Sequence, residues 1–281
     1  MNRKKRNNII RLTLLNLGFI VLCLLALVPI LYAVKVSLSG SGGILSSELS
    51  LLPKEPTLDN YKNILFEKPF LTWLKNSILL SVFTVIFSLC VSVPASYAFS
   101  RFRFKGRRLT LYLLLLLNAF PAILSMFAMY RILNLMGLIN TYSGLILIYS
   151  GTYTIFGIWN MKGYFDSIPI DIEEAAKIDG ANDRQLITRI VLPLARPAII
   201  VTAVMVLINV WNEYIFATLF LTGSEKYTLA AGLYSLQATE YTRNWPLFSA
   251  ASILVSIPVL FIFYKIQKYM VSGLTAGGVK G

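Results

Sequence analysis

Acidic side chains and paired alanines lie close together in the stretch 162–197, between two long apolar runs. Glu174 is followed by Ala175 and Ala176, whose small side chains form a low surface that another protein can approach closely. Glu174 can accept hydrogen bonds from such a partner. A helix lying at lipid headgroups is the alternative, but such helices are normally basic on their polar face, and this one is acidic. We therefore expect this stretch to dock a protein.

Signals around these residues predict two short helices. Ser167 or Asp171 can cap the start of the first, and Gly180 ends it because glycine accepts the left-handed conformation of a helix C-terminus. The second is predicted to begin with a capping box over Asn182–Gln185 and to end before Pro193. The acidic helix is thus a defined element and not an extended loop.

Catalytic chemistry is not expected. The chain has no histidine, which excludes Ser-His-Asp and Cys-His catalysis and the commonest metal ligand. Cys23 and Cys90 both lie in apolar runs, which excludes a disulfide framework. Since no G-x-x-x-x-G-K-[ST] motif occurs, the chain does not itself bind nucleotide phosphates in that way. We predict no enzyme activity, no metal site, no cofactor in this chain and an energy source on another subunit.

Six apolar runs must position these residues. The sequence is 56% hydrophobic and 14% charged, and each run has roughly the 20 residues needed to cross hydrocarbon as a helix. The predicted spans are 12–34, 71–100, 109–130, 142–161, 198–221 and 247–266. Kinks are expected at four prolines inside them, Pro29, Pro94, Pro121 and Pro258. The predicted fold class is all-α: a polytopic membrane protein with a single transmembrane domain over residues 1–281.

The net charge of +13 follows this topology. Lysine and arginine concentrate in alternate connections, around residues 3–11, 101–108, 162–196 and 265–280, whereas acids balance them elsewhere. The positive-inside rule therefore predicts that both termini and the stretch 162–197 are cytoplasmic. Arg101–Arg108 is interpreted as a topological anchor, with RNA or anionic lipid binding as the alternative. Partitioning by topology accounts for the charge, so no nucleic acid is expected as a partner, and the expected surroundings of the chain are membrane lipid.

The signature positions of 162–197 resemble the EAA loop of ABC importer permeases: Glu174-Ala175-Ala176, three residues, Gly180, nine residues, Ile190, one residue and Leu192-Pro193. Residues 137–149, 158–165, 211–214 and 266–281 resemble the carbohydrate-importing branch of that family. The tail GLTAGGVKG is similar to that of the smaller permease of maltose and maltodextrin transporters. The resemblance covers most of the chain from about Pro53 onward.

This resemblance implies a permease subunit of a binding-protein-dependent importer in a bacterial cell membrane, carrying a sugar of the maltodextrin type. The implied partners are a second, different permease, two copies of a cytoplasmic ABC ATPase that binds ATP and Mg, and an extracellular or periplasmic sugar-binding protein. The residues implied in ATPase coupling are Glu174, Ala175, Ala176, Asp179, Gly180, Leu192 and Pro193. Those of an ATPase-interface tail are Thr275, Gly277 and Gly278, and those of a binding-protein contact are Tyr234, Gln237 and Tyr241.

For a sugar, polar groups flanking an aromatic face are the expected recognition chemistry. Amides and acids within lipid are costly and tend to face a bundle interior or a cavity. The candidate residues of the substrate path are Asn118, Asn209, Trp211, Asn212 and Tyr214. Hydrogen bonding between helices is the alternative role of the three asparagines. Glu213, beside them, could instead pair with a loop cation.

Two other classes compete with the importer hypothesis. A carrier or channel acting alone is supported by the kinked helices and intramembrane polar residues, but it lacks a buried proton relay and does not explain the docking stretch. An intramembrane enzyme would need histidine or paired carboxylates at mid-membrane depth. Within the importer hypothesis, the substrate could instead be another disaccharide or glycerol phosphate.

Overall fold

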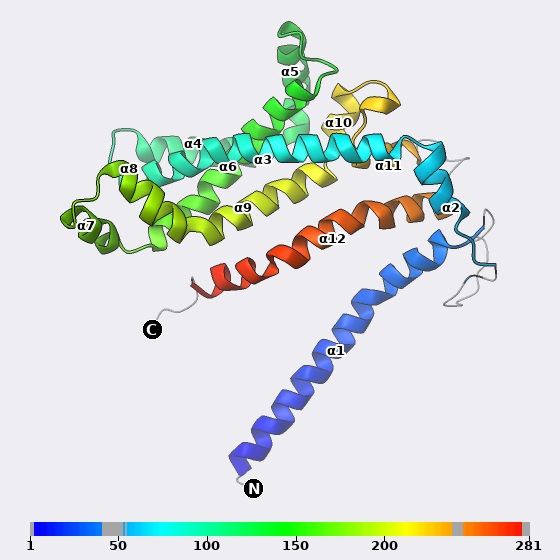
Figure 1. Ribbon diagram of the computed structural model, residues 1–281, viewed down its shortest axis with the longest axis horizontal. Coiled ribbons are helices and arrows are strands. Elements are labelled where there is room, and N and C mark those ends of the chain that lie inside the picture. The colour runs from blue at the N-terminus through cyan, green and yellow to red at the C-terminus, as the bar shows by residue number, and fades with distance from the viewer. Residues whose placement is uncertain (1–2, 41–52, 54, 238–243, 277–281) are drawn as a thin grey trace. The chain divides into compact units, whose positions relative to one another are not determined.

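The computed structural model describes residues 3–40, 53, 55–237 and 244–276, and every regular element in these ranges is a helix (Figure 1). An isolated β-bridge joins Ser39 to Pro56. The chain forms two compact parts. One comprises Leu71–Tyr234 with Pro258–Gly281, and the other comprises Met1–Phe70 with Ser235–Ile257. The all-α class predicted from the apolar runs is confirmed for the described residues.

By length and composition, four helical stretches could each cross a membrane within the described ranges: Ile10–Ser37, Phe70–Arg101, Asp183–Asn212 and Trp245–Gln267. They belong to α1 (Arg3–Ser37), α3 (Phe70–Arg101), α8 to α9 and α12 (Trp245–Ala276). Pro29, Pro94 and Pro258 each lie inside one of these helices. The predicted span 142–161 is helical as part of α6 (Tyr142–Ser167), but its many hydroxyl and amide side chains make it less apolar than these four.

The predicted span 109–130 is divided in two. α4 (Arg107–Ala119) and α5 (Ala122–Leu135) are separated by Phe120 and Pro121, and their axes differ by 101°. Proline lacks an N–H, and its ring clashes with the preceding turn of a helix. The kink expected at Pro121 is therefore a complete break, and counting the bent pair as one span raises the number of candidates to five.

The predicted span 198–221 is interrupted as well. α9 (Leu192–Asn212) ends where Glu213 has extended backbone angles, and α10 (Ile215–Phe220) follows after Tyr214. The expectation of one continuous helix here is wrong. The reason is local, since the Glu213 side chain accepts a hydrogen bond from Phe216 N at 2.8 Å and so starts a new helix.

The core of the larger part lies where α3, α6 and α9 pack together. α3 turns a row of small hydroxyl side chains inward: Ser77, Ser81, Thr84, Ser88, Ser92 and Ser96 are all buried. A Cβ atom added to Gly157 of α6 would lie 2.8 Å from Ser92 Cβ, so the two helices approach closely. Asn160 Nδ2 of α6 donates to Thr202 Oγ1 of α9 at 2.6 Å. Small side chains and one amide thus set the spacing of the bundle.

The two ends of these long helices carry different short elements. α7 (Ile170–Ile178) and α8 (Asp183–Gln185) lie at one end of α3 and α9, and α10 and α11 (Leu229–Ser235) lie at the other (Figure 1). A 3₁₀ turn, η3 (Ser224–Lys226), precedes α11. Tyr234 of α11, one of the residues predicted for binding-protein contact, is therefore on the opposite end of the larger part from the coupling residues of α7.

In the smaller part, polar contacts hold α2 (Asp59–Lys62) to the end of α1. Asn60 Nδ2 donates to the carbonyl oxygens of Ser37 and Ser39 at 3.0 and 2.9 Å, respectively. A π-helical segment, η1 (Asn63–Glu67), follows α2 and leads towards α3. These bonds order the end of the 35–70 connection, whose middle is outside the described residues.

Candidate functional site

The predicted docking helix is α7, and its first turn differs from expectation. Pro169 occupies the N-cap position, so neither Ser167 nor Asp171 caps the helix. Ser167 Oγ donates back into α6 instead. Proline is tolerated at this position because the helix start needs no N–H from it.

The end of α7 agrees with the sequence prediction. Gly180 has a φ of +85°, and Ala181 N donates to Ala176 O at 3.0 Å, the long bond of a glycine-closed helix end. The predicted capping box is also present. Asn182 Oδ1 accepts from Gln185 N at 2.9 Å, and Gln185 Oε1 accepts from Asn182 N at 3.0 Å.

The second helix does not end at Pro193 as predicted. From α8 it continues through the π-helical segment η2 (Leu186–Val191) into α9, and Pro193 lies in the first turn of α9. A π turn widens the helix where the proline ring and its missing N–H would otherwise break an α-helical bond. The docking stretch is consequently continuous with a long apolar helix.

A buried ion pair holds α7 against the end of α3. Arg101 Nε donates to Glu173 Oε1 at 2.6 Å, and both side chains are only 9% exposed. Tyr97 Oη donates to the other carboxylate oxygen at 2.7 Å, and Arg101 Nη2 donates to Ile168 O at 2.9 Å. Charge-assisted bonds of this kind are among the stronger ones in proteins, and both carboxylate oxygens are used. Arg101, the first residue of the stretch interpreted as a topological anchor, thus points inward to Glu173.

A second polar link joins α3 to the end of α6. Asp166 accepts from Ser100 Oγ at 2.7 Å and from Lys162 Nζ at 2.5 Å. Burial raises the pKa of Asp166, but the hydrogen bonds from Lys162 and Ser100 outweigh it and bring the pKa below its ordinary value. Asp166 therefore stays charged at neutral pH, and the ends of α3, α6 and α7 are joined by polar bonds.

The exposed face of α7 is mixed apolar and charged. Ile178 is 86% exposed and Ile170 54%, and the predicted coupling residues Glu174, Ala175, Asp179 and Gly180 are exposed too. Ala176 is not: it is buried in a cluster with Phe165, Leu186 and other apolar residues. Of the last two predicted residues, Leu192 is half-buried and Pro193 exposed. The low alanine surface thus faces inward at Ala176 and outward at Ala175.

The connection from α10 to α11 is tied closely to α3. Trp73 Nε1 donates to Ser224 O at 2.7 Å, Asn76 Nδ2 donates to Glu225 O at 2.9 Å, and Ser77 Oγ accepts from Leu229 N at 2.8 Å. A Cβ added to Gly232 would lie 2.3 Å from the Trp73 ring, so α11 packs directly on this indole. The described part of this connection is therefore held in a defined conformation against α3.

Two residues predicted for different sites lie together at this end. The rings of Tyr214 and Tyr234 stack with centroids 5.0 Å apart and planes at 29°, and they are 39% and 50% exposed, respectively. Tyr214 belongs to the break after α9, and Tyr234 belongs to α11. The structure thus brings a predicted substrate-path residue and a predicted binding-protein contact into one exposed aromatic pair.

The remaining path residues near this pair divide into exposed amides and a buried indole. Asn209 and Asn212 lie three residues apart on one exposed face of α9. Each uses one amide hydrogen on its own helix, to Met205 O and Ile208 O at 2.7 and 2.8 Å. Trp211 is 3% exposed, so its ring face is not offered to a ligand as expected.

Among the described residues, Glu213 has partners in its own bundle. The hydroxyl of Tyr149 on α6 donates to Glu213 Oε2. Phe216 N and Ala217 N donate to the same carboxylate at 2.8 and 3.3 Å. Glu213, the residue before the N-cap Tyr214, therefore bonds the first turn of α10 and ties the break in this helix to α6.

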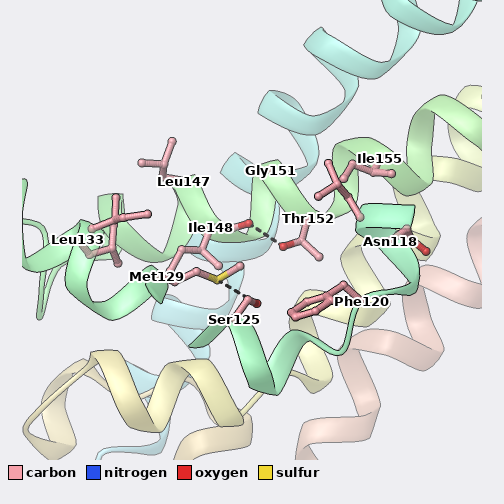
Figure 2. Close-up of a pocket in the computed structure, with 12 residues that line it drawn as sticks. Asn118, Phe120, Ser125, Met129, Leu133, Leu147, Ile148, Gly151, Thr152 and Ile155 are labelled. Atoms are coloured by element: carbon pink, nitrogen blue, oxygen red, sulfur yellow. Dashed lines mark hydrogen bonds between the residues drawn. The ribbon is translucent and has the colours of Figure 1, made fainter. Parts of the chain in front are cut away.

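Asn118 lines a cavity of about 420 Å³ between α4, α5 and α6. Figure 2 shows its lining, which is mostly apolar, with Phe120, Met129 and Leu133 among the side chains. The hydroxyls of Ser125 and Thr152 donate within their own helices, to Met129 Sδ at 4.0 Å and Ile148 O at 3.0 Å. Since a sugar needs several free polar partners, this cavity does not have the lining of a sugar site.

Several predicted positions fall outside these descriptions. Tyr241, Gly277 and Gly278 lie outside the described residues, and Thr275 belongs to α12. Gln237 is half-buried in the smaller part. Within the described ranges, no group of three or more His, Cys, Asp or Glu side chains could hold a metal ion.

Sequence reasoning missed the role of Arg101 and Glu173. The predicted topology did put the end of the second span and the stretch 162–197 on the same side of the membrane. Opposite charges at those two places were the available signal, and pairing them would have required the packing of α7 onto α3.

Known proteins are similar to this chain in sequence. Residues 91–275 match the family described as binding-protein-dependent transport system inner membrane component. The chain is 39% identical over 256 residues to the galactooligosaccharides transport system permease protein GanQ of Bacillus subtilis, covering 90% of each chain. It is 35% identical over 225 residues to the maltodextrin transport system permease protein MdxG of Bacillus subtilis, covering 80% of this chain and 81% of the relative.

A solved structure of an ABC transporter is similar to this chain in fold. It is a chain from the crystal structure of a bacterial ABC transporter involved in the import of the acidic polysaccharide alginate. The two chains superpose with a TM-score of 0.75 at 30% sequence identity, covering 96% of this chain and 98% of the other.

Proposed function

Because this chain belongs to the family of inner membrane components of binding-protein-dependent transport systems, we propose that it forms half of the pathway of an importer for maltodextrin-type oligosaccharides. It is a transport component and not an enzyme. Its proposed companion is a second, different permease that forms the other half. The observation that carries the proposal is the structure of α7. One face of this helix is exposed, acidic and apolar, and its buried face is bonded to α3 through Glu173 and Arg101.

The proposed role of α7 is to dock into one of two copies of a cytoplasmic ABC ATPase, which bind ATP and Mg. Glu174, Ala175, Asp179 and Gly180 are the exposed residues for this contact, with Ile178 as an apolar anchor. Ala176 packs the opposite face of the helix against the bundle. The tail residues Thr275, Gly277 and Gly278 are proposed to extend towards the same ATPases.

A sugar as substrate is supported by the relatives that import galactooligosaccharides and maltodextrin. In this chain, the chemistry that suits a pyranose ring is the exposed pair Tyr214 and Tyr234 with the amides of Asn209 and Asn212. Aromatic faces pack on the apolar face of such a ring, and amides bond its hydroxyls. We propose that this end of the bundle receives the sugar from an extracellular or periplasmic binding protein, with Tyr234, Gln237 and Tyr241 at the contact.

The proposed topology has six crossings in a bacterial cell membrane. They are α1, α3, the bent pair α4 and α5, α6, α9 with α10, and α12. The alternation of basic connections supports cytoplasmic termini and a cytoplasmic α7. The end of the larger part that holds α10 and α11 then faces outward.

Purification and uptake together test the proposal. The tagged chain is expected to co-purify from membranes with an ATPase and a second permease, and to restore uptake of labelled maltodextrins in a strain that lacks it. Glu174→Lys should leave the chain in the membrane but abolish uptake and loosen the ATPase. Asp59→Lys, the same charge change on a carboxylate that is 77% exposed in the smaller part, is the control and should transport normally.

Three results would contradict different parts of this assignment. Transport by the purified chain alone would make it a stand-alone carrier. Normal uptake by Glu174→Lys would remove α7 from the docking site. Uptake of another disaccharide or of glycerol phosphate, with none of maltodextrin, would keep the importer and change its substrate.

A further inference from the structure

The pair formed by Arg101 and Glu173 has no part in the docking surface itself. Glu173 points away from the exposed face of α7, and both side chains are 9% exposed. The pair joins two helices that are far apart in the sequence, since Arg101 ends α3 and Glu173 lies 72 residues later. It is therefore a fixed connection between α7 and one helix of the bundle.

Two further hydrogen bonds make this connection stiff. Tyr97, one helical turn before Arg101, donates to the second oxygen of Glu173 at 2.7 Å. Arg101 also donates to Ile168 O at 2.9 Å, at the residue that precedes the start of α7. α3 therefore holds both the helix and the chain entering it, through the charged guanidinium of Arg101 and the neutral hydroxyl of Tyr97.

The rest of the attachment of α7 is apolar. Ala176 packs in a cluster with Met161, Phe165, Leu186 and Ala195 of α6, η2 and α9, and Tyr97 of α3 packs against the same cluster. Apolar packing has no directional bonds, whereas Glu173 accepts one bond on each carboxylate oxygen, from Arg101 and from Tyr97, which fixes distance and direction. Movement of α7 is thus transmitted to α3 through directional bonds as well as through packing.

We propose that Arg101, Glu173 and Tyr97 are positioning residues that transmit the movement of α7 to α3, so that ATP hydrolysis by the docked partner drives opening of the pathway. This rests on the proposed docking of α7. α3 is the helix with the inward row of small hydroxyl side chains, along which α6 packs closely at Gly157. A displacement delivered at Arg101 reaches the core of the bundle along this helix.

The test measures sugar uptake and ATP hydrolysis in the same proteoliposomes, which contain the complete importer with its loaded binding protein. Arg101→Glu and Glu173→Arg are expected to remain bound to the ATPase and to hydrolyse ATP. The amount of sugar transported per ATP should fall by at least about fivefold, the lower end of the coupling between linked sites. The double variant Arg101→Glu/Glu173→Arg restores the opposite charges and should recover the ratio.

Matched variants keep the result decisive. Asp59→Lys/Lys62→Asp reverses an exposed ion pair in the smaller part, and should leave the ratio unchanged. If the single reversals fail to assemble because a buried like-charge pair is too costly, Glu173→Gln and Tyr97→Phe keep the shape of the cluster and should lower the same ratio.

Two outcomes would overturn the proposal. An unchanged ratio in the assembled variants would mean that the ion pair only stabilises the fold. A parallel loss of hydrolysis and uptake, without a change in their ratio, would place the pair in the docking contact. Failure of the wild-type chain to assemble with an ATPase would instead refute the proposed function, and it is seen before any variant is compared.

Discussion

Gly180 shows how one residue can be constrained by backbone conformation alone. Its φ is +85°, and no atom lies within 4 Å of the place where a Cβ would be. Space is therefore not the limit. The left-handed conformation costs an L-residue with a side chain about 1–2 kcal/mol, and β-branched residues suffer most.

The loss of uptake and of ATPase binding on replacing Gly180 should consequently depend on the shape of the new side chain. Gly180→Val is expected to unwind the end of α7 and to lower uptake and ATPase co-purification. Gly180→Asn should retain most of both, because asparagine tolerates this conformation. The measurements are uptake in cells and the yield of ATPase with the tagged chain. Equal loss in both variants would mean that the absence of a side chain matters for docking itself.

Tyr234 lies on α11 and forms an exposed aromatic pair with Tyr214. Tyr234→Ala should weaken the stimulation of ATP hydrolysis by loaded binding protein, since tyrosine contributes large contact area and a polar hydroxyl at protein contacts. Basal hydrolysis should not change. Tyr112→Ala, at a tyrosine of α4 that is 62% exposed, is the control. Full stimulation of the Tyr234 variant would remove α11 from the contact.

At the scale of elements, the close approach of α3 and α6 depends on the absence of a side chain at Gly157. Gly157 leaves room for Ser92, and an added Cβ would come within 2.8 Å of both Ser92 Cβ and Oγ. Hydroxyl and glycine positions of this kind allow helices in lipid to pack by close van der Waals contact. The bundle therefore tolerates polar residues inside because they are small.

Gly157→Ala should separate these helices and lower the melting temperature of the purified protein in detergent. Overpacking in a close-packed interior typically costs about 1–3 kcal/mol. Ser92→Gly removes the atoms in the way, and the double variant should regain much of the loss. Gly163→Ala, on the same helix with nothing within 4 Å, should not destabilise. Equal melting of the Gly157 and Gly163 variants would show that the helices can move apart freely.

At the scale of the whole molecule, the direction of the chain across the membrane places its two functional ends. Basic residues gather at the connection between α3 and α4, and the connection from α10 to α11 is on the opposite end of the larger part. If the first faces the cytoplasm, α7 does so as well, because Arg101 at the end of α3 bonds Glu173 directly.

Cysteine labelling in intact cells checks this arrangement. After Cys23 and Cys90 are replaced by serine, a membrane-impermeant maleimide should label Ser224→Cys from outside. Lys105→Cys should react only once the membrane is opened. Both positions are exposed, so the difference reports sidedness. The reverse pattern would invert the topology and place α7 outside, away from any cytoplasmic ATPase.

The amino-acid sequence by itself determined the local features of this protein. The long apolar runs specified membrane helices, and the glycine and capping-box residues specified the end of α7 and the start of α8. Such features depend on backbone preferences and on neighbours within four residues, which spacing reveals directly. The signature around Glu174 was recognisable for the same reason, as a pattern at fixed separations.

Only the tertiary structure decided which side each residue faces and with which distant group it bonds. Ala176 and Trp211 turned inward, although their residue types suit a contact surface. Arg101 pairs with Glu173, and Glu213 accepts a hydrogen bond from Tyr149, across separations of 72 and 64 residues in the sequence. Buried charges and amides take whichever partner the packing brings within reach, because leaving them unpaired is costly. Sequence spacing does not contain that choice, since it depends on how separate helices meet in space.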